Sequence, residues 1–173
     1  IYCIGGAQAI GAMAYGTEAV PSVAKITGPG NIFTTEAKRQ VYGHVGIDFL
    51  AGPSEVLILA DETADPGLIA TDLLAQAEHD PNSRPILVST DEEIARDAMT
   101  ELSEQLPALE TEETARECWD NNGEVIVADD MDAAVDIAND YAIEHLQVMT
   151  DEPRALMDDL HNYGSLFLGD HSP

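Results

Sequence analysis

The stretch Leu73-Leu74-Ala75-Gln76-Ala77-Glu78-His79-Asp80 lies near the middle of the 173-residue chain and decides how its neighbours are interpreted. An apolar run gives way here to polar residues, and Pro81 follows, so a helix is expected to end at this point. Asp65 and Pro66 supply an N-cap and a first-turn proline. Together these signals predict a helix over residues 66–79.

Two faces of this helix can be distinguished by spacing. Ile69, Leu73 and Ala77 are four residues apart, so they are expected to face a core. Gln76 and His79 are three apart and share another face at the helix end, where an amide oxygen and an imidazole could hold one cation or one polar substrate. A histidine in a last helical turn also interacts with free carbonyls and the helix dipole, so the pair alone leaves both interpretations open.

Strands and helices are expected to alternate along most of the chain. This alternation predicts an α/β fold with mainly parallel sheets, flanking helices and incomplete Rossmann-like units. Ligands of such sheets bind at the carboxyl ends of the strands, and a domain seam is expected in the loop of residues 51–55. Strands are predicted at 1–4, 23–26, 46–50, 56–60, 85–89, 124–128, 146–149 and 165–168, and helices at 5–16, 33–41, 66–79, 91–106, 111–120, 131–141 and 153–161.

The charge of the chain limits its partners. Asp and Glu number 33 against 7 Lys and Arg, a formal charge of −26, which argues against nucleic acid as a partner. The acids are not gathered in a tail, which favours a soluble protein of a high-salt cytoplasm, with an ordinary acidic protein as the alternative. No apolar run is long enough for a transmembrane helix and no signal peptide is visible, so a cytoplasmic protein without membrane contact is expected.

The ends and the cysteines carry weaker signals. The chain begins at Ile1, not at Met, and both ends are expected to be internal to a longer protein. Cys3 and Cys118 match no metal-binding spacing and are expected to be packed thiols in a reducing compartment.

Two glycine turns are predicted to join a strand to a helix. The first, Gly5-Gly6-Ala7-Gln8, has the context of a dinucleotide phosphate site but is not the G-x-G-x-x-G fingerprint. The second, Gly28-Pro29-Gly30-Asn31, follows the same logic. Its alternative is a tight turn in which Asn31 is the N-cap of the helix.

Two further polar groups lie in predicted loops. Ser54 places a hydroxyl beside a carboxylate at the expected seam, although a plain turn is also consistent with it. Glu144 and His145 lie between a helix and a strand, where histidine is the natural proton shuttle near neutral pH. The alternative is a histidine at a helix C-terminus beside a solvated glutamate.

Taken in order along the whole chain, these motifs resemble the histidinol dehydrogenase family. Any one of them is weak, but all of them in order are specific. The residues that carry the resemblance are Gly5-Gly6-Ala7-Gln8-Ala9, Gly28-Pro29-Gly30-Asn31, Thr35-Glu36-Ala37-Lys38-Arg39-Gln40, Ala51-Gly52-Pro53-Ser54-Glu55, Gln76-Ala77-Glu78-His79, Glu144-His145-Leu146 and Ser165-Leu166-Phe167-Leu168-Gly169.

The resemblance implies a zinc-assisted, NAD-dependent oxidation of L-histidinol to L-histidine through the aldehyde. By this likeness residues 1–53 are the C-terminal part of an NAD-binding Rossmann-like domain, and residues 54–173 are part of a second α/β domain with zinc and substrate residues. The implied roles are zinc and substrate binding by Gln76 and His79, NAD contact by Gln8 and Asn31, substrate binding by Ser54 and His145, base catalysis by His145 and water activation by Glu144.

The same resemblance implies that this chain holds only part of the site. The family's other zinc ligands, an Asp and a His, would follow residue 173, with the His coming from the second subunit of a homodimer. The isolated chain is therefore expected to be inactive or weakly active. The alternative is a non-catalytic nucleotide- or metal-binding module, either a degenerate relative or a truncated one.

Overall fold

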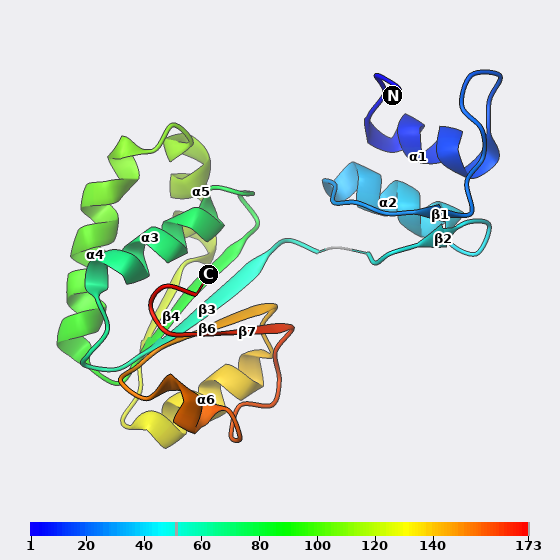
Figure 1. Ribbon diagram of the computed structural model, residues 1–173. Coiled ribbons are helices and arrows are strands. Elements are labelled where there is room, and N and C mark those ends of the chain that lie inside the picture. The colour runs from blue at the N-terminus through cyan, green and yellow to red at the C-terminus, as the bar shows by residue number, and fades with distance from the viewer. Residues whose placement is uncertain (51, 173) are drawn as a thin grey trace. The chain divides into compact units, whose positions relative to one another are not determined.

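The computed structural model describes residues 1–50 and 52–172, and the chain forms two compact units (Figure 1). The N-terminal unit is Ile1–Gly52 and the C-terminal unit is Pro53–Pro173. The boundary falls in the loop predicted over residues 51–55, of which Ala51 lies outside the described residues. Each unit is described by itself below.

The N-terminal unit consists of two helices and two short parallel strands. Its elements are α1 (Gly6–Tyr15), β1 (Lys25–Ile26), α2 (Ile32–Val41) and β2 (Gly46–Ile47). The strands at 23–26 and 46–50 were predicted to be longer than the two residues that each contains. The buried core of this unit is a small cluster of Ile10, Ala14, Ile26, Val41 and Val45.

The prediction of a strand over residues 1–4 is wrong. Ile1, Tyr2 and Ile4 are exposed and adopt no regular structure, and Cys3 is exposed instead of packed. A strand needs a hydrogen-bonded neighbour, and none of the described strands pairs with these residues. Cys118, by contrast, is buried as predicted, and its thiol donates to the carbonyl of Ser83.

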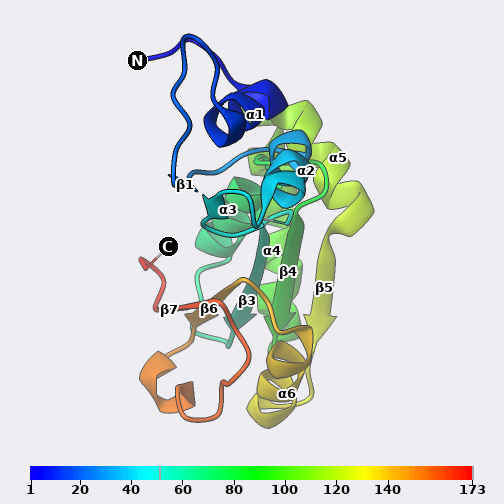
Figure 2. The same ribbon diagram turned by 90° about the vertical axis from the view of Figure 1, so that its right-hand side faces the viewer.

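The C-terminal unit is built on a five-stranded, entirely parallel sheet (Figure 2). The strand order is β5-β4-β3-β6-β7. The strands β4 and β5 are thus added on one side of β3, and the later strands β6 and β7 on its other side. This reversal beside β3 creates a topological switch point. The strands are β3 (Glu55–Ala60), β4 (Arg84–Ser89), β5 (Glu124–Val127), β6 (His145–Met149) and β7 (Ser165–Leu168).

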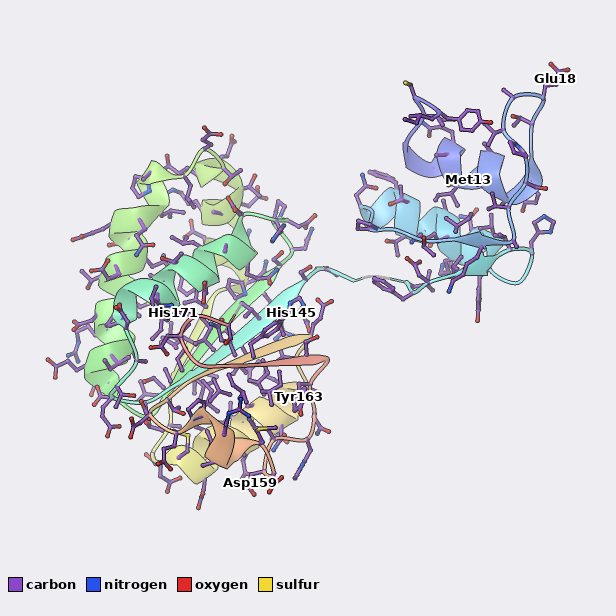
Figure 3. The ribbon with its side chains drawn as sticks, in the orientation of Figure 1. Met13, Glu18, His145, Asp159, Tyr163 and His171 are labelled. Atoms are coloured by element: carbon purple, nitrogen blue, oxygen red, sulfur yellow. The ribbon has the colours of Figure 1, made fainter. Side chains whose placement is uncertain are left out.

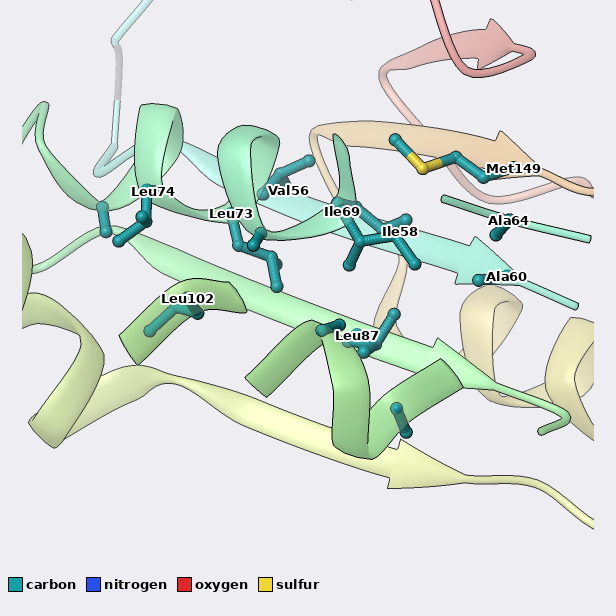
Figure 4. Close-up of a cluster of buried hydrophobic side chains, with 14 of the residues drawn as sticks. Val56, Ile58, Ala60, Ala64, Ile69, Leu73, Leu74, Leu87, Leu102 and Met149 are labelled. Atoms are coloured by element: carbon teal, nitrogen blue, oxygen red, sulfur yellow. The ribbon is translucent and has the colours of Figure 1, made fainter. Parts of the chain in front are cut away.

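Helices cover both faces of this sheet. The helices α3 (Pro66–Ala77), α4 (Glu92–Gln105) and α5 (Glu112–Asn122) pack on one face, where Ile69 and Leu73 meet Ile58 and Leu87 (Figure 4). Helix α6 (Met131–Tyr141) packs on the other face against Leu57 and Leu146. The α/β fold with mainly parallel sheets and flanking helices is therefore confirmed.

The predicted signals for helix starts are also confirmed. The Asp65 carboxylate accepts hydrogen bonds from the N–H groups of Gly67 and Leu68, and the Asp91 carboxylate caps α4 in the same way. Helix α3 ends at Ala77, two residues earlier than predicted, so His79 lies just beyond the helix. Among the described residues, no helix has both the length and the apolar character needed to cross a bilayer.

The helix predicted over residues 153–161 is wrong. Only a short 3-10 turn, Pro153–Leu156, forms there. The Asn139 side chain accepts from the N–H groups of His161 and Asn162 and donates to the carbonyl of Asp159. These backbone groups are satisfied by a side chain of α6, so they are not available to extend a helix.

Candidate functional site

A pocket of about 290 Å³ lies between α3 and strands β6 and β7, on the face of the sheet that α3 covers. It combines two histidines, two amides and one carboxylate with three apolar side chains, a mixture typical of small-molecule sites. Its lining residues are Val56, Asp72, Ala75, Gln76, His79, His145, Gln147 and Phe167.

Secondary-structure periodicity explains why these side chains meet. Asp72, Gln76 and His79 follow one another at four- and three-residue steps, so they share one side of α3 and of the residues just after it. Alternate residues of a strand point the same way, which puts His145 and Gln147 of β6 on the face toward α3. The predicted joint face of Gln76 and His79 is thus present.

The pocket lies toward the amino ends of the strands, opposite to the end expected for this class of sheet. His145 is the first residue of β6 and Val56 the second of β3. At the carboxyl ends, hydrogen bonds join the segments that follow β3 and β6 on either side of the switch point. The Asp151 N–H donates to the Asp61 carboxylate over 3.0 Å. The Asp61 N–H in turn donates to the carbonyl of Met149. Two carboxyl-bearing residues there would repel an anionic ligand.

Gln76 carries an unsatisfied polar atom beside the pocket. The residue is 8% exposed, and its buried Nε2 atom has no hydrogen-bond partner among the described residues. Since buried amides are almost always paired, this N–H donor is available for a hydrogen bond to a molecule bound in the pocket. The amide oxygen of Gln76 and the imidazole of His79 are chemically suited to zinc.

The described residues supply only part of a zinc shell. Zinc sites take four ligands, or three and a water, and the described part of the chain holds no group of three or more His, Cys, Asp or Glu residues arranged for a metal. Gln76 and His79 therefore fit zinc as two of its ligands, and any others must come from outside these residues.

The Asp72 carboxylate is a pocket residue that the sequence analysis missed. Its Oδ2 atom accepts a hydrogen bond of 2.8 Å from Nε2 of Gln147, which is itself only 3% exposed. Burial raises the pKa of Asp72, and the hydrogen bond from Gln147 partly offsets this increase. Its position four residues before Gln76 is the signal that could have revealed it.

His145 is half-buried at the start of β6 (Figure 3). Its ring and that of Phe167 form an edge-type contact, with ring centroids 5.8 Å apart. Glu144 is exposed and does not line the pocket, and its Oε2 atom accepts from the N–H of Glu55 over 3.4 Å. Ser54 precedes Glu55 and does not line the pocket either. The structure thus brings Gln76, His79 and His145 together and keeps Glu144 and Ser54 on adjoining loops.

The backbone of Glu144 is held closely by the start of β7. Its carbonyl accepts from the N–H of Ser165 over 2.8 Å, and the Gly164 N–H donates to the carbonyl of Ile143. A Cβ at Gly164 would lie 2.7 Å from the Glu144 carbonyl oxygen. Only glycine therefore permits this approach, a requirement that the sequence analysis did not recognise.

The other two predicted site residues belong to the N-terminal unit. Gln8 is exposed in the first turn of α1. The Asn31 side chain accepts from the N–H groups of Phe33 and Thr34, so the interpretation of Asn31 as the N-cap of α2 is confirmed. A contact of Gln8 or Asn31 with a cofactor stays a prediction.

The parallel sheet, the flanking helices and the polar, histidine-bearing pocket define an α/β protein with a candidate small-molecule site. A model of the histidinol dehydrogenase family matches residues 1–173, and the chain belongs to that family. It is 51% identical over 173 residues to histidinol dehydrogenase of Methanothermobacter thermautotrophicus. It is 49% identical over 169 residues to a histidinol dehydrogenase homolog of Shouchella clausii.

A solved structure agrees with this assignment. The chain is similar to histidinol dehydrogenase from Elizabethkingia anophelis, with a TM-score of 0.93 and 42% identity over 99% of this chain and 40% of that one. The chain covers 41% of the Methanothermobacter protein and 40% of the Shouchella protein. It therefore spans about two-fifths of the length of these relatives.

Proposed function

We propose that this chain is part of an enzyme that oxidises L-histidinol to L-histidine through L-histidinal, with NAD as the hydride acceptor. The observation that carries the proposal is the pocket in which Gln76, His79 and His145 meet, in a member of the histidinol dehydrogenase family. An imidazole beside an amide and a second imidazole is suited to binding a polar alcohol and removing its proton.

In this proposal His145 is the general base of the first oxidation. It would take the hydroxyl proton of histidinol, and NAD, when bound, would supply the acceptor for the hydride of the same carbon, so that the aldehyde results. Glu144 would take a proton from the water that adds to the aldehyde, and a second NAD, when bound, would supply the acceptor for the second oxidation, to the carboxylate. The exposed position of Glu144 beside the pocket is consistent with its contact with water.

Gln76 and His79 would hold zinc, which when bound would polarise and orient the substrate oxygen. Gln76 and His79 line the same pocket at adjoining positions, which supports this assignment. The two further ligands, an Asp and a His, would come from outside the described residues, with the His contributed by the partner subunit of a homodimer. Ser54 would contact the substrate, and Gln8 and Asn31 would contact NAD.

The cellular setting is also part of the proposal. A formal charge of −26 supports a protein of a high-salt cytoplasm, such as that of a halophilic archaeon, because a dense carboxylate surface stays hydrated while salt screens its self-repulsion.

A non-catalytic binding module is the second candidate function. A relative that is 49% identical to this chain carries the name histidinol dehydrogenase homolog, which does not itself state an activity. A degenerate member would keep the pocket and bind zinc or NAD without turnover.

The test is histidinol-dependent NADH formation in high salt with zinc, using the longest reading frame that contains this chain. We expect turnover in the wild type and a loss of more than about a hundredfold in His145→Gln, because a general base contributes this much. His161→Gln is the matched control, since His161 is exposed outside the pocket. A folded, zinc-loaded protein that binds NAD without turnover would support the binding module instead.

A further inference from the structure

Lys38 is a buried lysine for which the proposed reaction has no use. It belongs to α2 and is 5% exposed, whereas lysines are almost never buried without a partner. Its Nζ atom lies 2.7 Å from Oδ1 of Asp48 and also donates to the carbonyl of Gly28. The lysine therefore ties its own helix to two other segments of the N-terminal unit.

Asp48 completes the arrangement from the other side. Its Oδ2 atom accepts a hydrogen bond of 2.7 Å from the N–H of Gly28, while Oδ1 binds Lys38. The hydrogen bonds from Lys38 and Gly28 hold the pKa of Asp48 far below its usual range, so the carboxylate stays charged. Lys38 and Asp48 together hold both polar backbone groups of Gly28, and we refer to this pair as the Gly28 clamp.

The clamp acts on a turn that only glycine readily adopts. Gly28 has a φ of +130°, a conformation that other residues rarely occupy, and the chain then passes through Pro29 and Gly30 into the N-cap of α2. A glycine with free peptide groups would sample many conformations, so the clamp removes this freedom. Asn31 lies three residues further along the same turn.

Lys38 is not itself placed to bind a phosphate. Its charge is matched by Asp48, and its hydrogen bonds go to the carboxylate and to a carbonyl. Direct electrostatic attraction of an anionic cofactor is therefore not its role. Any influence of Lys38 on cofactor binding would therefore act through the conformation of the turn at Gly28.

We propose that Lys38 and Asp48 are positioning residues that hold the turn of residues 28–31 in a form ready to bind the dinucleotide cofactor. This inference rests on the proposed function, because the cofactor contact of Asn31 is part of that proposal. A turn that is fixed before binding loses less conformational entropy when the cofactor arrives, which increases affinity.

The test measures NAD affinity directly, by calorimetry, in the longest reading frame that contains this chain. Lys38→Met should raise the dissociation constant for NAD by roughly tenfold or more, since small displacements of binding groups have effects of this size. The KM for histidinol should change by less than about twofold, because the pocket lies in the other unit. Lys25→Met is the matched control: Lys25 is an exposed lysine of β1 in the same unit, so it should bind NAD like the wild type.

A second variant separates positioning from simple stability. Lys38→Met leaves the Asp48 charge without its partner and is expected to destabilise the unit. The double variant Lys38→Met/Asp48→Leu removes both charges, so it should recover much of the lost thermal stability while its NAD affinity stays low. If the double variant recovers both stability and affinity, the clamp is structural only and the inference is overturned.

The remaining outcomes are also decisive. Equal NAD affinity in Lys38→Met and Lys25→Met would refute the clamp's role while leaving the proposed reaction intact. A wild type that binds NAD but does not oxidise histidinol would refute the reaction, and the affinity comparison would still test the clamp. A wild type that does not bind NAD at all would overturn both.

Discussion

Each of the two units of the chain is stabilised internally in a different way. The N-terminal unit has two-residue strands and a small buried cluster around Ile26, and it relies on glycine turns and the Gly28 clamp. The C-terminal unit has two extensive apolar layers, one on each face of its sheet. The comparison teaches that the proposed cofactor turn depends on polar contacts, whereas the pocket depends on the packing beneath it.

Equivalent truncations in the two cores should have the largest and most unequal effects. Ile58→Ala removes a fully buried side chain of β3 and should lower the free energy of unfolding by about 4 kcal/mol. Ile26→Ala, in the smaller cluster, should cost about 2 kcal/mol. Trp119, the single tryptophan, lies in the C-terminal unit, so its fluorescence during urea unfolding should detect only the first change. A shift of the Trp119 transition in Ile26→Ala would mean that the two units unfold as one.

Gly164→Ala should come next, with a cost of about 2 kcal/mol, because the added Cβ would meet the Glu144 carbonyl and force the backbone to move. Turnover of the folded variant should also fall, since the displaced residues include Glu144 and His145. The control is Gly11→Ala in α1, where a Cβ would meet no described atom and the helix should become slightly more stable. Unchanged turnover in Gly164→Ala would show that the Glu144 backbone is not held as tightly as described.

Substitution of Asn31 distinguishes its two roles in the N-terminal unit. Asn31→Ala removes the N-cap of α2 and should cost about 1 kcal/mol, measured by thermal unfolding. Asn31→Asp keeps an acceptor for the same N–H groups, so stability should be retained while the KM for NAD rises. If Asn31→Asp binds NAD as the wild type does, Asn31 serves only as the N-cap of α2 and makes no specific contact with NAD.

Ala142→Gly should stabilise the C-terminal unit by about 0.5–1 kcal/mol. Ala142 ends α6 with a φ of 50°, and it is the only described residue other than glycine with a positive φ. Glycine adopts this conformation without the steric cost of a Cβ. Urea unfolding followed by Trp119 measures the effect, and a loss of stability would show that the alanine methyl group makes a compensating contact.

The smallest effect is expected from Asp72→Asn and should depend on pH. The raised pKa means that the native state binds a proton more readily than the unfolded state, so ionisation of Asp72 lowers stability as pH rises. Asn keeps an acceptor for Gln147 and carries no charge, so it should be more stable near neutral pH by less than about 1 kcal/mol. This advantage should disappear as pH falls below the ordinary range of aspartate, and an advantage independent of pH would contradict the assignment.

Local signals were sufficient for most helices and for the buried strands. The caps at Asp65 and Asp91 and the core spacing of Ile69 and Leu73 are properties of neighbouring residues, which a sequence displays directly. The apolar run at Ile1 failed because pairing depends on a partner strand, which no local pattern reveals.

The contacts that the sequence analysis missed are all long-range. The bond between Asp72 and Gln147 and the clamp between Gly28, Lys38 and Asp48 join segments that only the fold brings together. The end of the sheet at which the pocket lies also depends on where α3 finishes relative to β6. Hydrophobic periodicity carries no information about such pairings.

The position of β7 has a consequence for folding during synthesis. Strands β3, β4 and β5 are consecutive neighbours and can pair as soon as they leave the ribosome, whereas β6 must return to β3 and β7 must then pair with β6. Ser165, which holds the Glu144 carbonyl, is the first residue of β7. A nascent chain that lacks this last strand can thus contain a largely folded sheet while its pocket, and the backbone beside His145, is still incomplete.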